Sequence, residues 1–165
     1  MPAVLSHHAY GKSHVRLTKV TRHADRHDLT ELCVAIRLEG DLAASYTQGD
    51  NRRVVPTDTM KNTVYALARD HPLADLESFG LTLANHFIET FSHVTTATVS
   101  LEEQPWQRIT VDGREHPHAF VGGGSDKQTA TVTLGRPGQR VESGLDGLLL
   151  LKTTDSAFRG FLRDR

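Results

Sequence analysis

The spacing of the hydrophobic residues changes twice along this chain, and no other feature constrains its fold as strongly. Over residues 29–39, hydrophobic side chains alternate with polar or small ones, which is typical of a strand with one buried face. Residues 14–22 also read as a strand, and the polar link 23–28 is short enough to join the two in an antiparallel hairpin. The alternating hydrophobic positions are Leu32, Val34, Ile36 and Leu38. The chain therefore opens with two paired strands.

The period becomes helical after Pro56. Proline disfavours a helix in the residue before it, and Thr57 and Asp58 are both good helix caps, so we expect a helix to begin there. A second helical stripe follows the breaker His71-Pro72. The hydrophobic positions at helical spacing are Met60, Val64 and Leu67 in the first segment and Leu76, Phe79, Leu83, Phe87 and Phe91 in the second. Two helices thus follow the two strands.

Alternation returns over residues 95–101 and 129–134, on either side of a glycine-rich stretch at 122–126. The resulting order of elements is ββααββ. It predicts an α+β fold, in which an antiparallel sheet carries the two helices on one face, rather than a doubly wound parallel sheet.

The last segment does not fit this unit. Residues 136–138 have the composition of a linker, and residues 145–151 form a strongly apolar run that we expect to be another strand. No strand is expected after it, so it would pair outside the chain or remain an exposed edge. We therefore expect one unit over residues 9–138, with residues 139–165 as the opening strand of a truncated second unit.

Charge and cysteine content exclude several classes of partner. Lys and Arg number 19 against 20 Asp and Glu, so no net field draws the chain to nucleic acid or to an acidic membrane, and neither is expected as a partner. The apolar runs are too short to cross a bilayer, and the first residues lack a secretory signal pattern. The single cysteine, Cys33, allows no internal disulfide and is expected to be a packed thiol. We therefore expect a cytoplasmic location.

Several stretches, in order along the chain, resemble one known family. They are Tyr10-Gly11-Lys12-Ser13, Thr57-Asp58-Thr59-Met60-Lys61-Asn62-Thr63-Val64-Tyr65, His86-Phe87-Ile88-Glu89, His116-Pro117-His118-Ala119-Phe120 and Leu151-Lys152-Thr153-Thr154-Asp155-Ser156-Ala157-Phe158-Arg159-Gly160-Phe161. On these motifs the chain resembles the N-terminal half of urate oxidase, or uricase. The resemblance implies the tunnelling fold (T-fold), in which each protomer has two ββααββ units in tandem and protomers form a barrel tetramer.

The resemblance also implies a reaction. The family oxidises urate with O2 to 5-hydroxyisourate and H2O2, without a metal or an organic cofactor. The electron-rich purine anion can itself reduce oxygen, so the protein need only bind, deprotonate and position it. Urate and O2 are thus the expected small-molecule partners, and a homo-oligomer is the expected assembly.

By this resemblance, Lys12 and Thr57 match a catalytic proton-relay pair, in which a desolvated lysine works through the threonine hydroxyl. The amides of Thr57 and Asp58, at a helix start, would hold the edge of the anionic purine. Phe158 matches the phenylalanine that stacks on the purine. Without the resemblance, a solvated lysine, a plain helix cap and a core aromatic would be the ordinary readings of Lys12, Thr57 and Phe158.

Other features carry less weight. His116 and His118 lie two apart on one expected strand, and His23 and His27 lie four apart, but neither pair completes a metal shell, so no metal site is expected. The glycines at 122–124 lack the spacing of a phosphate loop and are expected to form a hairpin loop.

Part of the family's site has no counterpart in this chain. An arginine, a glutamine, an asparagine and a histidine of the family all lie in the second unit, and the pocket forms between protomers. Two hypotheses remain. In the one we favour, the chain is part of a working urate oxidase and is inactive without the remainder. In the other, it is a catalytically silent T-fold module that binds a purine or pterin, or pairs with an intact subunit.

Overall fold

The computed structural model describes residues 5–136 and 138–162. Its elements are β1 (Ala9–Arg22), β2 (His27–Gly40), α1 (Ala43–Thr47), α2 (Thr57–Asp70), α3 (Leu76–Thr90), β3 (Val94–Gln104), β4 (Trp106–Val111), β5 (Arg114–Gly122), β6 (Lys127–Gly135) and β7 (Gly138–Asp146). Across the described ranges, no helix is both long and apolar enough to cross a membrane.

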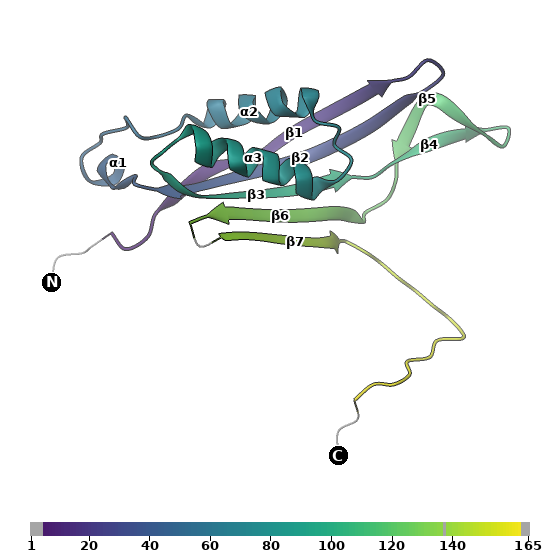
Figure 1. Ribbon diagram of the computed structural model, residues 1–165. Helices are drawn as coiled ribbons and strands as arrows, with labels where there is room; N and C mark the ends of the chain where they lie inside the picture. Colours follow the sequence, from purple (N-terminus) through teal and green to yellow (C-terminus); the bar gives the residue numbers. More distant parts are fainter. Residues whose placement is uncertain (1–4, 137, 163–165) are drawn as a thin grey trace.

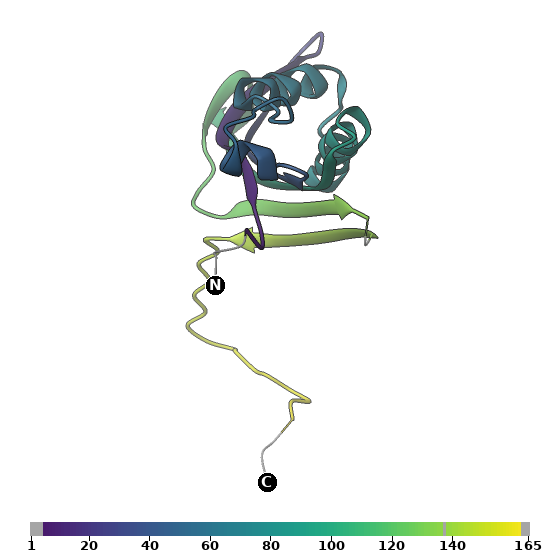
Figure 2. The same cartoon turned by 90° about the vertical axis from the view of Figure 1, so that its left-hand side faces the viewer.

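Five strands form one antiparallel sheet in the order β1-β2-β3-β6-β7. Helix α2 packs over β1, and α3 packs over β3 and β6. Both helices lie on the same side of the sheet, and among the described residues the opposite side carries none (Figures 1 and 2). The predicted α+β fold with two helices on one face is therefore confirmed.

The core lies between the sheet and these two helices. In β2 the predicted alternation is confirmed: Val34 is fully buried and pairs with Val15 on one side and Leu101 on the other. The α3 stripe is buried as predicted, except that Phe91 ends the helix and is only partly buried. Asp75 caps α3 by accepting a hydrogen bond from the Ser78 amide at 2.6 Å. Each large side chain buried here contributes roughly 1.5–3 kcal/mol.

Three elements were not predicted from the sequence: the short helix α1 and the strands β4 and β5, which pair as a hairpin. The hairpin forms a separate two-stranded sheet that extends beyond the end of the main sheet (Figure 1). Its hydrophobic side chains Ile109, Val111 and Val121 are all more than a third exposed. The hairpin therefore lacks the buried hydrophobic face that marks a half-buried strand. At its base, Trp106 Nε1 donates a hydrogen bond to Glu31 Oε2 at 3.0 Å.

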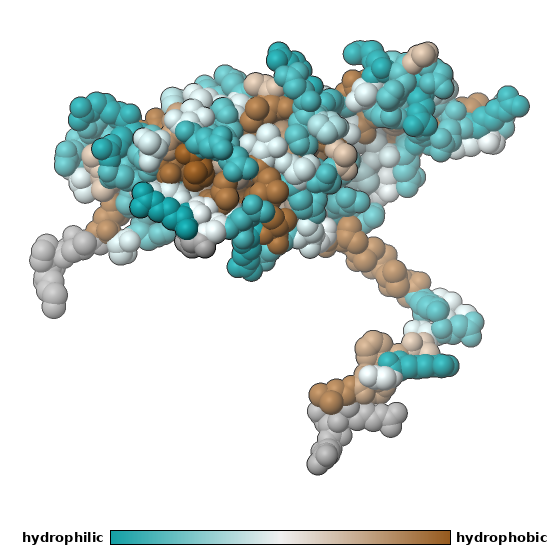
Figure 3. Space-filling model, viewed as in Figure 1, coloured by the Kyte–Doolittle hydropathy of each residue, from teal (hydrophilic) through white to brown (hydrophobic). Residues whose placement is uncertain are grey.

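The prediction of a strand over residues 145–151 is wrong. The last strand, β7, lies earlier and ends at Asp146, because it pairs with β6 from Gly135 opposite Gly138 onward. Among the residues that the structure describes, no strand lies beside the apolar run, and Leu149 is 90% exposed. This run forms the brown connection leaving the body in Figure 3. Pro137, in the expected linker, lies outside the described residues. The division into units 9–138 and 139–165 stays a prediction.

Candidate functional site

Lys12 lies on β1 just before a bulge. The pairing of β1 with β2 runs regularly to Lys12 opposite Ile36 and resumes at Val15 opposite Val34. Ser13 and His14 therefore stand against the single residue Ala35, and β1 carries one extra residue. A bulge bends a strand and redirects the side chains beside it. Here it leaves Lys12 partly buried, while Val15 beyond the bulge enters the core.

The position directly before Lys12 on β1 requires glycine. A Cβ atom built on Gly11 would lie 1.8 Å from the carbonyl oxygen of Ile36, which is backbone and cannot move aside without separating the strands. The absence of a side chain at Gly11 therefore lets β1 approach β2 closely beside Lys12.

Helix α2 begins at Thr57, but neither Thr57 nor Asp58 caps it, which corrects the sequence-based expectation. Pro56 is the N-cap and makes no side-chain cap hydrogen bond. Its extended backbone, with φ −56° and ψ 138°, leads directly into the helix, so Thr57 is already helical. The amides of the first turn have no partner within a helix. Thr57 and Asp58 are exposed, so their amides and the Thr57 hydroxyl can face a ligand.

Hydrogen bonds from three side chains hold α2 alongside β1, with the helix and the strand running in the same direction. The Tyr10 hydroxyl contacts Val55, just before the helix, accepting from its N–H at 2.6 Å and donating to its C=O at 3.1 Å. Farther along, the Tyr65 hydroxyl donates to the Arg16 carbonyl at 2.9 Å. At the end of the helix, Lys19 Nζ donates to the carbonyl oxygens of Ala68 (3.0 Å), Arg69 (3.2 Å) and His71. This alignment places Lys12 near the N-terminal end of α2.

The electrostatics at this end agree with that placement. Lys61 Nζ donates to Asp58 Oδ1 at 3.0 Å and, with its charge, lowers the pKa of the Asp58 carboxyl; the charge of Lys12 lowers it further. Lys12 and Asp58, the residue after Thr57, therefore lie within range of each other's charge. Within the described residues, no hydrogen bond joins Lys12 to Thr57 directly.

A shallow groove of about 390 Å³ lies beside Lys12, but neither Thr57 nor Asp58 lines it. It is lined by residues 9–13 of β1, residues 35–37 of β2, and Thr98 and Ser100 of β3.

Phe158 is not part of this arrangement. Its side chain is 82% exposed in the segment after β7, and its ring lies 5.6 Å from that of Phe161. Lys12, Thr57 and Asp58 are thus gathered at one place, and Phe158 is not among them.

Sequence reasoning also missed two residues at this place, Tyr10 and Lys61. Lys61 follows Asp58 by three residues, a spacing that puts the two side chains together on a helix and could have been noticed. Tyr10 precedes Lys12 by two residues on a strand, hence on the same face. Its partner Val55 is 45 residues away, and no local pattern indicates that contact.

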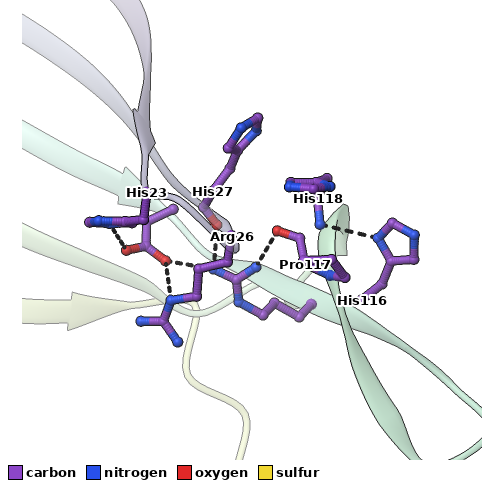
Figure 4. A network of polar contacts seen from close by, with 8 residues as sticks. His23, Arg26, His27, His116, Pro117 and His118 are labelled. Atoms are coloured by element: carbon purple, nitrogen blue, oxygen red, sulfur yellow. Dashed lines mark hydrogen bonds and ion pairs between the residues drawn. The ribbon is translucent and has the colours of Figure 1, made fainter.

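The histidine pairs belong to a different feature, the junction between the β1–β2 turn and the β4–β5 hairpin (Figure 4). The rings of His27 and His118 lie 4.4 Å apart. Arg108 joins the turn and the hairpin, because its guanidinium donates hydrogen bonds to Asp28 Oδ1 at 2.5 Å, to the Pro117 carbonyl at 3.0 Å and to the His27 carbonyl. Among the described residues, no three His, Cys, Asp or Glu side chains are arranged to hold a metal ion.

This junction is expected to loosen in acid. Burial lowers the pKa of His27, and nearby positive groups lower it further. These groups are His118, Arg22, Arg108 and His23. Because the folded pKa is below the unfolded value, the unfolded state takes up protons first, and stability is lost as pH falls below about 6.5 through the folded pKa. Once exchange rates are corrected for the intrinsic pH dependence of amide exchange, the protection factors in β4 and β5 should therefore fall between about pH 7 and pH 5.

His27→Gln should flatten this pH dependence, because the glutamine does not titrate. His7→Gln, at a histidine outside the junction, is the matched control and should leave it intact. An unchanged pH response in His27→Gln would show that His27 does not govern the junction.

The sheet with its two helices on one face defines the class of this protein as a T-fold. The family model described as Uricase matches residues 8–133, and the chain belongs to the uricase family. It is 44% identical over 162 residues to the uricase of Arthrobacter globiformis, covering 98% of this chain and 52% of that protein. It is 40% identical over 160 residues to the uricase of Aspergillus flavus, covering 94% of this chain and 52% of that one.

Solved structures agree. The crystal structure of Arthrobacter globiformis uricase superposes with a TM-score of 0.86 at 44% identity, covering 99% of this chain and 55% of that one. A crystal structure of Bacillus sp. TB-90 urate oxidase superposes with a TM-score of 0.76 at 28% identity, covering 95% and 60%. The chain therefore spans about half the length of the curated relatives it matches.

Proposed function

We propose that this chain supplies the Lys12–Thr57 part of a urate oxidase site, which oxidises urate with O2 to 5-hydroxyisourate and H2O2 in purine degradation. The observation that carries the proposal is the alignment of α2 on β1 through Tyr10 and Tyr65, which puts Lys12 toward the uncapped start of the helix in a member of the uricase family. Full activity needs the part of the family's protein that this chain does not match.

The chemistry requires little beyond acid–base groups and positioning. Urate gives up two electrons and two protons to O2, which becomes H2O2, and the oxidised purine then adds one water at C5 to form 5-hydroxyisourate. Thr57 would pass a proton between the substrate or water and Lys12. The first-turn amides of α2 would hold the anionic edge of the purine, where the helix dipole favours negative charge. No metal or organic cofactor is needed in this scheme.

The proposal extends to the assembly. A homotetramer would place Phe158 of a neighbouring protomer on the purine, opposite Lys12 and Thr57. The high exposure of Phe158 in this chain supports a role outside its own fold. A cytoplasmic location is supported by the free thiol of Cys33.

To test the proposal, this chain is produced together with the C-terminal half of the Arthrobacter globiformis uricase. We name this pair the complemented enzyme. Urate consumption and peroxide formation are measured for the chain alone, for the C-terminal half alone and for both produced together. We expect negligible turnover by either half and clear turnover by the pair.

A purified pair that associates but consumes no urate would contradict the proposal and favour a catalytically silent module. Robust turnover by the 165-residue chain alone would contradict the claim that it holds only part of the site. Size measurement of the pair separates failed association from failed catalysis.

A further inference from the structure

We propose that Tyr10 is a positioning residue, whose hydroxyl fixes the start of α2 against β1 and so sets the distance between Lys12 and Thr57. This inference rests on the proposed function, because it assigns Tyr10 a role in the same site.

The contact is bidentate. One hydroxyl oxygen accepts from the Val55 N–H at 2.6 Å and donates to the Val55 C=O at 3.1 Å, so both backbone groups of one residue are held by one side chain. Val55 itself is buried, with 2% of its surface exposed. Burial raises the pKa of Tyr10, which keeps the phenol protonated and able to donate. A buried backbone group that loses its partner is costly, so the contact is a strong constraint.

The chain segments that join this contact to Lys12 and to Thr57 are both short, and the second is rigid. Tyr10 and Lys12 are two apart on a strand, so their side chains share a face of β1. Val55 and Thr57 are also two apart, with Pro56 between them, whose ring fixes φ. The path from Lys12 through the Tyr10 hydroxyl to Thr57 therefore contains few free rotations.

Another contact offers a matched control. The Tyr65 hydroxyl also joins α2 to β1 through a backbone carbonyl, that of Arg16 at 2.9 Å. It lies about two turns along the helix from Thr57. Tyr65→Phe therefore removes the same chemical group from the same pair of elements, away from the site.

The experiment compares Tyr10→Phe with Tyr65→Phe in the complemented enzyme. Small displacements of catalytic groups cost large factors in rate, so Tyr10→Phe should lower kcat by about tenfold or more. KM should stay within about threefold, because the amides of the first turn still bind the purine. Tyr65→Phe should change kcat by less than about twofold. A wild-type kcat in Tyr10→Phe would overturn the inference, as would equal losses in the two variants.

A second readout does not depend on activity. In the 165-residue chain, nuclear Overhauser contacts between the Lys12 side chain and the first turn of α2 should be present in the wild type and in Tyr65→Phe. They should be lost or weakened in Tyr10→Phe. Retention of these contacts in a folded Tyr10→Phe would overturn the positioning role. If the complemented wild type associates but does not turn over, the proposed function fails, and this readout still decides the role of Tyr10.

Discussion

Thr57→Ala is expected to lower kcat of the complemented enzyme about a hundredfold, the usual scale for losing acid–base assistance. KM for urate should change little, because the substitution keeps the amides of Thr57 and Asp58 at the start of α2. The fold should not suffer, since alanine is a better helix former than threonine and Thr57 makes no cap hydrogen bond. Steady-state kinetics of the variant give both parameters.

Thr57→Ser keeps the hydroxyl and is the matched control for this prediction. It should retain most of the turnover of the wild type. If Thr57→Ala weakened urate binding as much as turnover, the residue would serve binding and not proton transfer.

Gly11→Ala is expected to lower the free energy of unfolding by about 3 kcal/mol, the upper end of ordinary overpacking costs. The added methyl group would meet the Ile36 carbonyl oxygen at 1.8 Å, so β1 must move away from β2. For a chain of this size the melting temperature should fall by roughly 10 °C. Thermal unfolding of the 165-residue chain measures the change.

Gly122→Ala provides the control, because a Cβ atom there has no neighbour within 4 Å and Gly122 also lies on a strand. Its melting temperature should stay close to that of the wild type. A Gly11→Ala variant as stable as Gly122→Ala would mean that the two strands are not as close beside Lys12 as the structure has them.

The order of the main elements could be predicted because each has one buried and one exposed face. The alternation around Val34 and the helical stripe through Phe79 each predict one buried face, and both side chains are buried in the structure. The hairpin containing Val111 and Val121 could not be predicted in this way, because both of its faces remain partly exposed.

Near the end of the chain, the sequence predicted a strand where none forms. In the described part of the chain, the apolar run ending at Leu151 pairs with no strand, whereas the polar strand β7 forms through backbone pairing with β6. Hydrophobicity alone therefore does not predict a strand where the neighbouring strand decides the pairing.

The candidate site was predicted from motif resemblance and not from periodicity. That resemblance indicated Lys12, Thr57, Asp58 and Phe158, and the alignment of α2 on β1 puts the first three toward the same end of the helix. It could not name Tyr10, because the contact with Val55 appears only once β1 and α2 are packed together. It also could not show that Pro56, rather than Thr57, occupies the cap position.

We expect the amine of Lys12 and the hydroxyl of Thr57 to act as one unit in the oxidation of urate. A double-mutant cycle tests it most directly, by measuring kcat of the complemented enzyme for Lys12→Met, for Thr57→Ala and for the two combined. Residues that act as a unit are strongly non-additive, so the double variant should be about as slow as the slower single variant. If the two losses instead multiply, the residues act independently and the claim is contradicted.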